Sequence, residues 1–137
     1  MCAKHNSTDN GLRTYALDRV ESVHLRKTKF KLPTAIDLPN YFTHCFGIIL
    51  PTNETPQAIT FTFDNGQANY IINYPLHTSQ RVIKVTKSHT TFEITVFVTY
   101  DLLVELLSYG ETIKINSPKT LVKEMIAIYT HTLRNYA

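Results

Sequence analysis

The segment AITFTF, residues 58–63, is the part of the sequence from which the fold prediction starts. Its side chains alternate, so that Ile59, Phe61 and Phe63 share one face of a strand and the two threonines share the other. This period of two predicts a strand, and the elements that follow it decide the architecture.

Helical and strand patterns alternate downstream of this segment. The sequence predicts a helix at 66–74, strands at 81–87 and 91–100, a helix that Asp101 caps and Gly110 ends, a strand at 112–115, and a last helix with Ser117 as N-cap and Pro118 as first residue. The order strand, helix, strand, strand, helix, strand, helix is that of a split βαβ domain. We therefore predict an α+β, ferredoxin-like domain with an added C-terminal helix.

Residues 1–36 have a different pattern. We predict a strand end at 1–5, a turn at 6–11, a strand at 12–17 and an extended segment at 22–30. So few strands cannot form an independent core, and we expect them to be the remnant of a domain truncated at its N-terminal side. A linker at 33–39 and a short helix from Asp37 to about Cys45 then lead into the second domain, at 37–137.

The positive charge of the chain is concentrated in its first part. Residues 1–36 hold seven Lys/Arg and three Asp/Glu, which gives +4, and the rest holds seven and eight, which gives −1. A basic segment attracts polyanions, although a solvated strand face explains the charge equally well. No apolar run approaches the roughly 20 residues of a membrane-spanning helix. Two cysteines form no disulfide framework, so we expect a cytoplasmic protein without a membrane partner.

Four segments resemble a known family when they are read in order. The run Arg13-Thr-Tyr-Ala-Leu-Asp-Arg19-Val, followed by Phe30 and Pro33, is similar to the last strands of a WYL domain. The segment Pro75-Leu-His-Thr-Ser-Gln80 resembles the P-x-H-x-S-Q segment of the C-terminal extension of that domain. Residues 101–110 and 115–118 are similar to its L-x-x-E-L-L-s-y-G helix and its V-x-x-P segment. The resemblance extends from about Leu12 to Tyr136.

The resemblance implies the C-terminal regulatory part of a bacterial WYL-domain transcription regulator. Residues 1–36 would be the last strands of an Sm-like β-barrel, and 37–137 the WYL C-terminal extension. Such regulators bind DNA through a winged helix-turn-helix domain, which is missing here, and are usually dimers. Their effector, which the WYL and extension domains sense, is in some members single-stranded DNA or a cyclic dinucleotide. We thus expect a nucleic-acid or nucleotide effector and a homodimer.

Five residues are candidates for contacting that effector: Arg13, Arg19, His77, Gln80 and Arg81. The two arginines at the family's basic positions have guanidinium groups suited to phosphate, unless they pair with Asp18 or Glu21. His77 and Gln80 either bond a nucleotide or fix their loop. Arg81 and Lys84 have unlike parity, so both cannot easily face one groove, and Arg81 is preferred because it adjoins His77 and Gln80.

No enzyme, metal site or cofactor is predicted. The six histidines show no ligand spacing, Ser79 near His77 lacks a strained elbow and a third orienting group, and four glycines leave little room for a phosphate loop. Exposed aromatic residues on a ferredoxin-like sheet could stack on bases, and Tyr70, Tyr74, Phe97 and Tyr100 are candidates for this, but core or interface roles are favoured. A small-molecule-binding module and a purely structural dimerisation domain are the alternative functions.

Overall fold

The computed structural model describes residues 2–4, 12–14, 17–29, 38–47, 49, 51 and 54–137. The chain forms two compact units, Met1–Asp37 and Leu38–Ala137. In the first unit, β1 (Cys2–Lys4) pairs antiparallel with β2 (Leu12–Thr14), and a 3-10 helix, η1 (Leu17–Arg19), follows. The strand predicted at 12–17 is therefore wrong at its end, where Leu17 begins a helical turn. The assignment of this unit to an Sm-like barrel stays a prediction.

The second unit begins with a short helix, α1 (Leu38–Tyr41), and not with one that continues to Cys45. Two turns end it, in which Thr43 N donates to Asn40 O at 3.2 Å and Cys45 N donates to Phe42 O at 3.0 Å. These bonds span three residues instead of four, so the chain leaves the helical path. Residues 42–47, which we call the entry segment, then lead towards the sheet.

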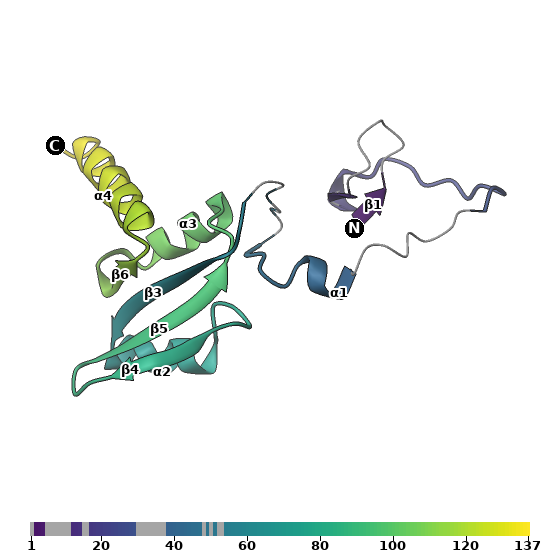
Figure 1. Ribbon diagram of the computed structural model, residues 1–137. Helices are drawn as coiled ribbons and strands as arrows, with labels where there is room; N and C mark the ends of the chain where they lie inside the picture. Colours follow the sequence, from purple (N-terminus) through teal and green to yellow (C-terminus); the bar gives the residue numbers. More distant parts are fainter. Residues whose placement is uncertain are drawn as a thin grey trace. The chain divides into compact units, whose positions relative to one another are not determined.

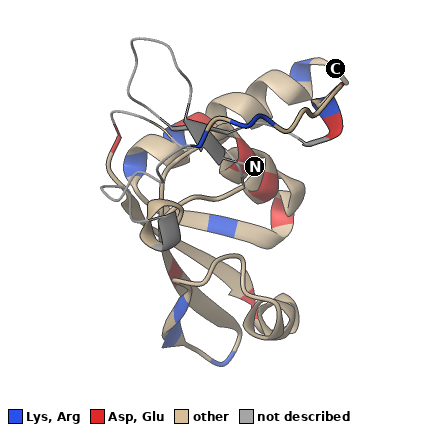
Figure 2. Cartoon of the chain, turned by 90° about the vertical axis from the view of Figure 1, so that its right-hand side faces the viewer, with Lys and Arg blue, Asp and Glu red and all other residues tan. Residues whose placement is uncertain are grey.

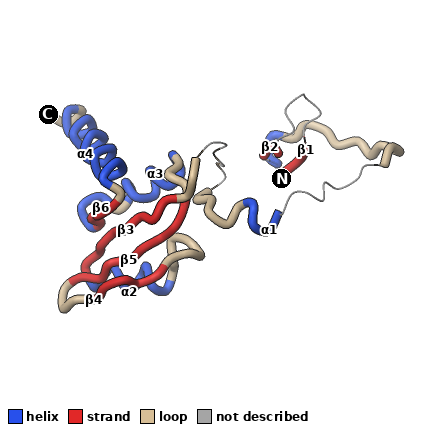
Figure 3. The backbone as a smooth tube through the Cα atoms, viewed as in Figure 1, coloured by secondary structure: helices blue, strands red, loops and turns tan. Residues whose placement is uncertain are grey.

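The described part of the second unit is built around a four-stranded antiparallel sheet with the order β4-β5-β3-β6. Its elements follow one another as β3 (Gln57–Asp64), α2 (Asn65–Asn73), β4 (Arg81–Val85), β5 (His89–Val96), α3 (Tyr100–Ser108), η2 (Gly110–Thr112), β6 (Ile113–Ser117) and α4 (Lys119–Arg134). Figures 1 and 3 show β3, β5 and β4 side by side and α4 at the C-terminal end. This order and topology confirm the predicted ferredoxin-like α+β fold with an added C-terminal helix.

One face of the sheet forms the core together with the helices. Every second side chain of β3 and β5 is buried there, and Phe61 stacks on Phe92 with ring centroids 5.6 Å apart. The helices cover this face with apolar side chains, which are Ala68 and Ile71 of α2, Leu102, Leu103 and Leu106 of α3, and Leu121 and Met125 of α4. The opposite face, which we call the open face, carries the alternate polar residues of the strands.

Two predicted helix caps are wrong. The N-cap of α3 is Thr99, whose side chain accepts a hydrogen bond from Leu102 N, and Asp101 lies within the first turn. The strand before it ends at Val96, so Tyr100 belongs to α3. Ser117 is the last residue of β6, and its hydroxyl bonds the hydroxyl of Thr60 at 2.7 Å instead of capping α4. Pro118 takes the N-cap position of α4.

A β-bulge changes the parity of β4. Arg81 pairs with Glu93 and Lys84 pairs with Thr91, with a register shift between Val82 and Lys84. Glu93 and Thr91 are two residues apart on β5 and share its open face, so Arg81 and Lys84 lie on the same face. The expectation that these two residues point to opposite faces is wrong, because the extra residue restores their alignment.

No helix of the described residues combines the length and the apolar composition that crossing a bilayer would require.

Candidate functional site

The entry segment is fixed to the end of β5. Phe97 N donates to His44 O at 2.9 Å, and the ring nitrogen Nδ1 of His44 lies 3.1 Å from Thr95 O. The rings of His44 and Phe97 meet edge to face, with centroids 6.4 Å apart. The entry segment therefore continues the hydrogen bonding of the sheet beyond Arg81, the first residue of β4, and His44 supplies most of these contacts.

Gly47 allows the far end of the entry segment to approach α3. Its φ of +72° is a conformation that residues with a Cβ atom disfavour, and a Cβ atom at this position would clash with the side chain of Asp101. Only glycine fits both conditions. The start of α3 and the entry segment are thus in direct contact.

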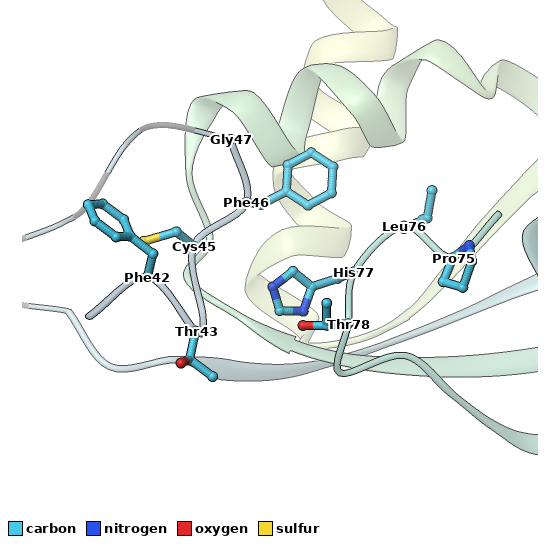
Figure 4. Close-up of a pocket in the computed structure, with 9 residues that line it drawn as sticks. All are labelled: Phe42, Thr43, Cys45, Phe46, Gly47, Pro75, Leu76, His77 and Thr78. Carbon is cyan, nitrogen blue, oxygen red and sulfur yellow. The ribbon is translucent and has the colours of Figure 1, made fainter. Parts of the chain in front are cut away.

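A pocket of about 610 Å³ lies between the entry segment and the loop 75–78 (Figure 4). Figure 4 shows the His77 ring pointing from its loop towards the backbone that carries Cys45 and Phe46. Aromatic rings, one thiol and two threonine hydroxyls are present in its wall, which consists of Phe42, Thr43, Cys45, Phe46, Gly47, Pro75, Leu76, His77 and Thr78. The pocket is thus partly apolar and partly hydrogen-bonding, as ligand sites usually are.

His77 connects the two sides of this pocket. Its Nδ1 accepts a hydrogen bond from Ser79 N at 3.1 Å, which leaves the ring proton on Nε2, and the Cys45 backbone is its hydrogen-bonding neighbour across the pocket. Burial lowers the pKa of His77; the bond to the Cys45 carbonyl opposes this effect, and the nearby His44 adds to it. A pKa below the usual value of about 6.5 keeps the imidazole neutral at pH 7. The neutral ring can hold both bonds at once.

Two further side chains stabilise the loop through hydrogen bonds. The hydroxyl of Ser79 accepts from Thr95 N at 2.8 Å and lies 2.8 Å from Nδ1 of His77. Gln80 accepts from Leu76 N at 2.9 Å and donates to Ile71 O at 2.8 Å, so its amide ties the loop to the end of α2. This pattern supports the loop-fixing interpretation of Gln80. The Ser79–His77 contact likewise serves the loop, because the same hydroxyl is bonded to the sheet.

Cys45 forms a buried part of the pocket wall. Its side chain is nearly inaccessible to solvent, and burial raises the pKa of its thiol. A thiol with a raised pKa stays protonated at neutral pH and behaves as a small apolar group. No group of three or more potential metal-ligating His, Cys, Asp or Glu side chains is found among the described residues.

The predicted ligand-binding residues occupy three places. His77 and Gln80 share one loop, in which Gln80 N donates to His77 O at 2.9 Å. Arg81 begins β4 on the open face, where its Nε and Nη2 donate to Oε1 of Glu93 at 2.9 and 2.5 Å. Arg13 is in β2 and Arg19 is the exposed last residue of η1, and both belong to the first unit. Lys and Arg residues also lie along β4 and in its hairpin turn (Figure 2).

The two phenylalanines of the pocket were missed in the sequence. Phe42 and Phe46 belong to the run YFTHCF at 41–46, of which we interpreted all but the last residue as helix. Three aromatic residues and one histidine within six positions were a signal of a specialised segment, but their spacing alone gave no partner across a pocket.

One of two comparisons with known proteins places the chain in a family. A search of the curated proteins found no match. The family model of the WCX domain, a domain associated with WYL-type regulators, matches residues 55–133. The matched region contains β3 to α4 except the last residue of α4, and thus the whole sheet and the 75–80 loop. Since this match spans more than half of the chain, the protein belongs to the WCX domain family.

Proposed function

We propose that the chain is the effector-sensing region of a DNA-binding transcription regulator of the WYL type, and that its effector is a nucleotide or a nucleic-acid strand. The observation that carries this proposal is the pocket between the entry segment and the 75–78 loop. Its volume of about 610 Å³ lies in the range of small-ligand sites, roughly 300–1,000 Å³. A single nucleobase fits within that range.

The chemistry of the pocket suits a base. The rings of Phe42 and Phe46 offer flat apolar surfaces, and stacking of a base on an aromatic side chain contributes about 1–3 kcal/mol. The hydroxyls of Thr43 and Thr78 can each donate and accept hydrogen bonds to the edge of a base. The excess positive charge of residues 1–36 would attract the phosphates of such a ligand towards the chain.

The position of the pocket gives a route from binding to regulation. One wall belongs to the entry segment, which connects the first unit to the sheet, and the other belongs to a loop of the WCX domain. A ligand that fills the pocket in only one arrangement of this segment shifts the population towards that arrangement. In a regulator that carries a DNA-binding domain, such a shift would change the affinity for DNA.

The test is a titration of a labelled single-stranded oligonucleotide into the full chain, followed by fluorescence anisotropy. Phe42→Leu and Phe46→Leu keep an apolar side chain but remove the flat ring, and we expect each to weaken binding on the order of tenfold. Tyr136→Leu is the matched control, because it removes an aromatic ring that is 87% exposed at the chain end. Absence of binding by the wild type, or equal binding by all variants, would overturn the proposal.

A small-molecule effector without phosphates is the second candidate. The described residues that line the pocket include no lysine or arginine, which favours an uncharged ligand over a polyanion. Ionic strength separates the two, since affinity for a phosphate-bearing ligand falls steeply with added salt while affinity for an uncharged ligand does not.

A further inference from the structure

A row of four polar side chains crosses the open face of the sheet, one from each strand. The register pairs Lys114 of β6 with Thr62 of β3, Thr62 with Thr91 of β5, and Thr91 with Lys84 of β4. All four therefore point to the same side, away from the helices. With strands about 4.8 Å apart, the Cα atoms of the two lysines are separated by roughly 14 Å.

Hydrogen bonds fix the middle of this row. The hydroxyls of Thr62 and Thr91 are 2.9 Å apart, and Nδ2 of Asn116 donates to the Thr62 hydroxyl at 2.8 Å. The threonines are half-buried, whereas Lys84 and Lys114 are exposed at the two edges. A flat polar strip with a cation at each end results.

The charge of the open face is positive at neutral pH. The acidic residues at open-face strand positions are Glu93 and, at the end of β3, Asp64; Asp64 caps α2, and Arg81 pairs with Glu93. That contact is also the only ion pair among the residues that the structure describes. The row of Lys84 and Lys114 thus contributes two positive charges that no described carboxylate neutralises.

The described strand positions of the open face hold no phenylalanine, tyrosine or tryptophan. Most of them are occupied by alanine, threonine, serine, asparagine and charged residues, with His89 at the first position of β5, while Tyr70, Tyr74 and Tyr100 belong to α2, its C-cap and α3. A surface made mainly of ammonium groups and hydroxyls fits phosphates and sugars better than bases. Its contacts would therefore be independent of base sequence.

We propose that the open face binds the phosphate backbone of a nucleic-acid strand, with Lys84 and Lys114 each contacting a phosphate and the two threonine hydroxyls lying between them. This inference rests on the proposed nucleic-acid ligand, but it concerns a surface other than the pocket. The β-bulge in β4 is essential to it, because a regular strand would turn Lys84 to the other face.

The experiment compares two double variants of the full chain with equal change in charge. Lys84→Gln/Lys114→Gln removes the proposed contacts, and Lys119→Gln/Lys123→Gln removes two exposed lysines of α4. The probe is a labelled 12-nucleotide single strand of thymidines, with its duplex with adenosines as a second arm. The slope of log affinity against log salt and the affinity at about 0.1 M salt are measured for each.

The open-face variant is expected to lose affinity on the order of tenfold, and the slope to become shallower by about 1.4, since each contacted phosphate of a single strand contributes about 0.7. The α4 variant is expected to change neither quantity by as much as half of that. A stronger effect on the duplex would assign the surface to double-stranded DNA. Each single lysine variant should give about half the change in slope, which guards against a folding defect in the double variant.

Two outcomes overturn the inference in different ways. If the wild type binds the oligonucleotide and both double variants behave alike, the open face is not the phosphate surface, and the proposed function stands. If the wild type binds no oligonucleotide, the nucleic-acid ligand and this surface both fail. The Phe46→Leu variant distinguishes the sites further, because loss of a stacking ring should lower affinity without changing the slope.

Discussion

Gly47 combines two constraints that usually occur separately. Its φ is +72°, and the place of a Cβ atom is taken by the side chain of Asp101. Gly110 has a similar φ of +54°, but nothing lies within 4 Å of the place of its Cβ atom. Substitution of the two glycines by alanine therefore distinguishes the free-energy cost of backbone strain, present at both positions, from that of a steric clash, present only at position 47.

We predict that Gly47→Ala destabilises the protein more than Gly110→Ala does. A left-handed alanine costs about 1–2 kcal/mol in either place, and at position 47 the clash adds to it. Urea denaturation of both variants measures the difference in the free energy of unfolding. Equal losses would show that the entry segment does not approach Asp101 as described.

Single residues also show where the sequence was informative and where it was not. His77, which the family resemblance singles out in the sequence, lines the pocket. In a regular strand Lys84 would face away from Arg81; a bulge reverses this, and no residue in RVIKV indicates the bulge. Gln80 was a reasonable ligand by chemistry, but both ends of its amide are used by Leu76 and Ile71.

At the level of elements, the entry segment and the 75–80 loop are joined by one imidazole. Nδ1 of His77 accepts a hydrogen bond from Ser79 N, and a backbone hydrogen bond with Cys45 raises the pKa of His77 against the effect of burial. A second proton on the ring would convert the acceptor Nδ1 into a donor facing the donor N–H of Ser79. The titratable neighbours are His44, whose charge would repel the protonated ring, and Cys45, whose thiol stays protonated.

This contact predicts a loss of stability on acidification. The pKa of His77 is lower in the folded state than in the unfolded chain, where it is about 6.5. Its contribution is therefore fully present above about pH 6.5 and is lost as the pH falls from there to the folded-state pKa. We expect His77→Asn, which can still accept from Ser79 N, to reduce the difference in unfolding free energy between pH 7.5 and 5.5. An unchanged difference would contradict the assignment.

Strands and helices of the second unit were largely predictable, because each shows a clear period of apolar residues. The caps were harder. Thr99 and Asp101 are both good N-cap residues, and the choice between them depends on where β5 ends, which the pattern of alternating residues did not mark. In the same way, Ser117 belongs to β6 because its hydroxyl bonds that of Thr60, a residue 57 positions away.

For the molecule as a whole, the order of elements was sufficient to predict the ferredoxin-like fold, but not the pocket. The walls of the pocket come from segments about thirty residues apart in the chain, and neither has a period that indicates the other. Long-range contacts such as the one between Phe97 N and His44 O decide this arrangement. The open face was predictable only in part. The alternation of residues in β3 predicts that its threonines share this face, but the alignment of the two lysines depends on the strand register, which the sequence does not indicate.

The central claim is that an effector occupies the pocket beside the entry segment. Hydrogen–deuterium exchange of the full chain, with and without saturating single-stranded oligonucleotide, tests it most directly. We predict slower exchange in peptides covering 42–47 and 75–80, where the amides of Ser79, Gln80 and Cys45 are already hydrogen-bonded, and no change in 119–134. Protection confined to 119–134, or none in either wall of the pocket, would contradict the claim.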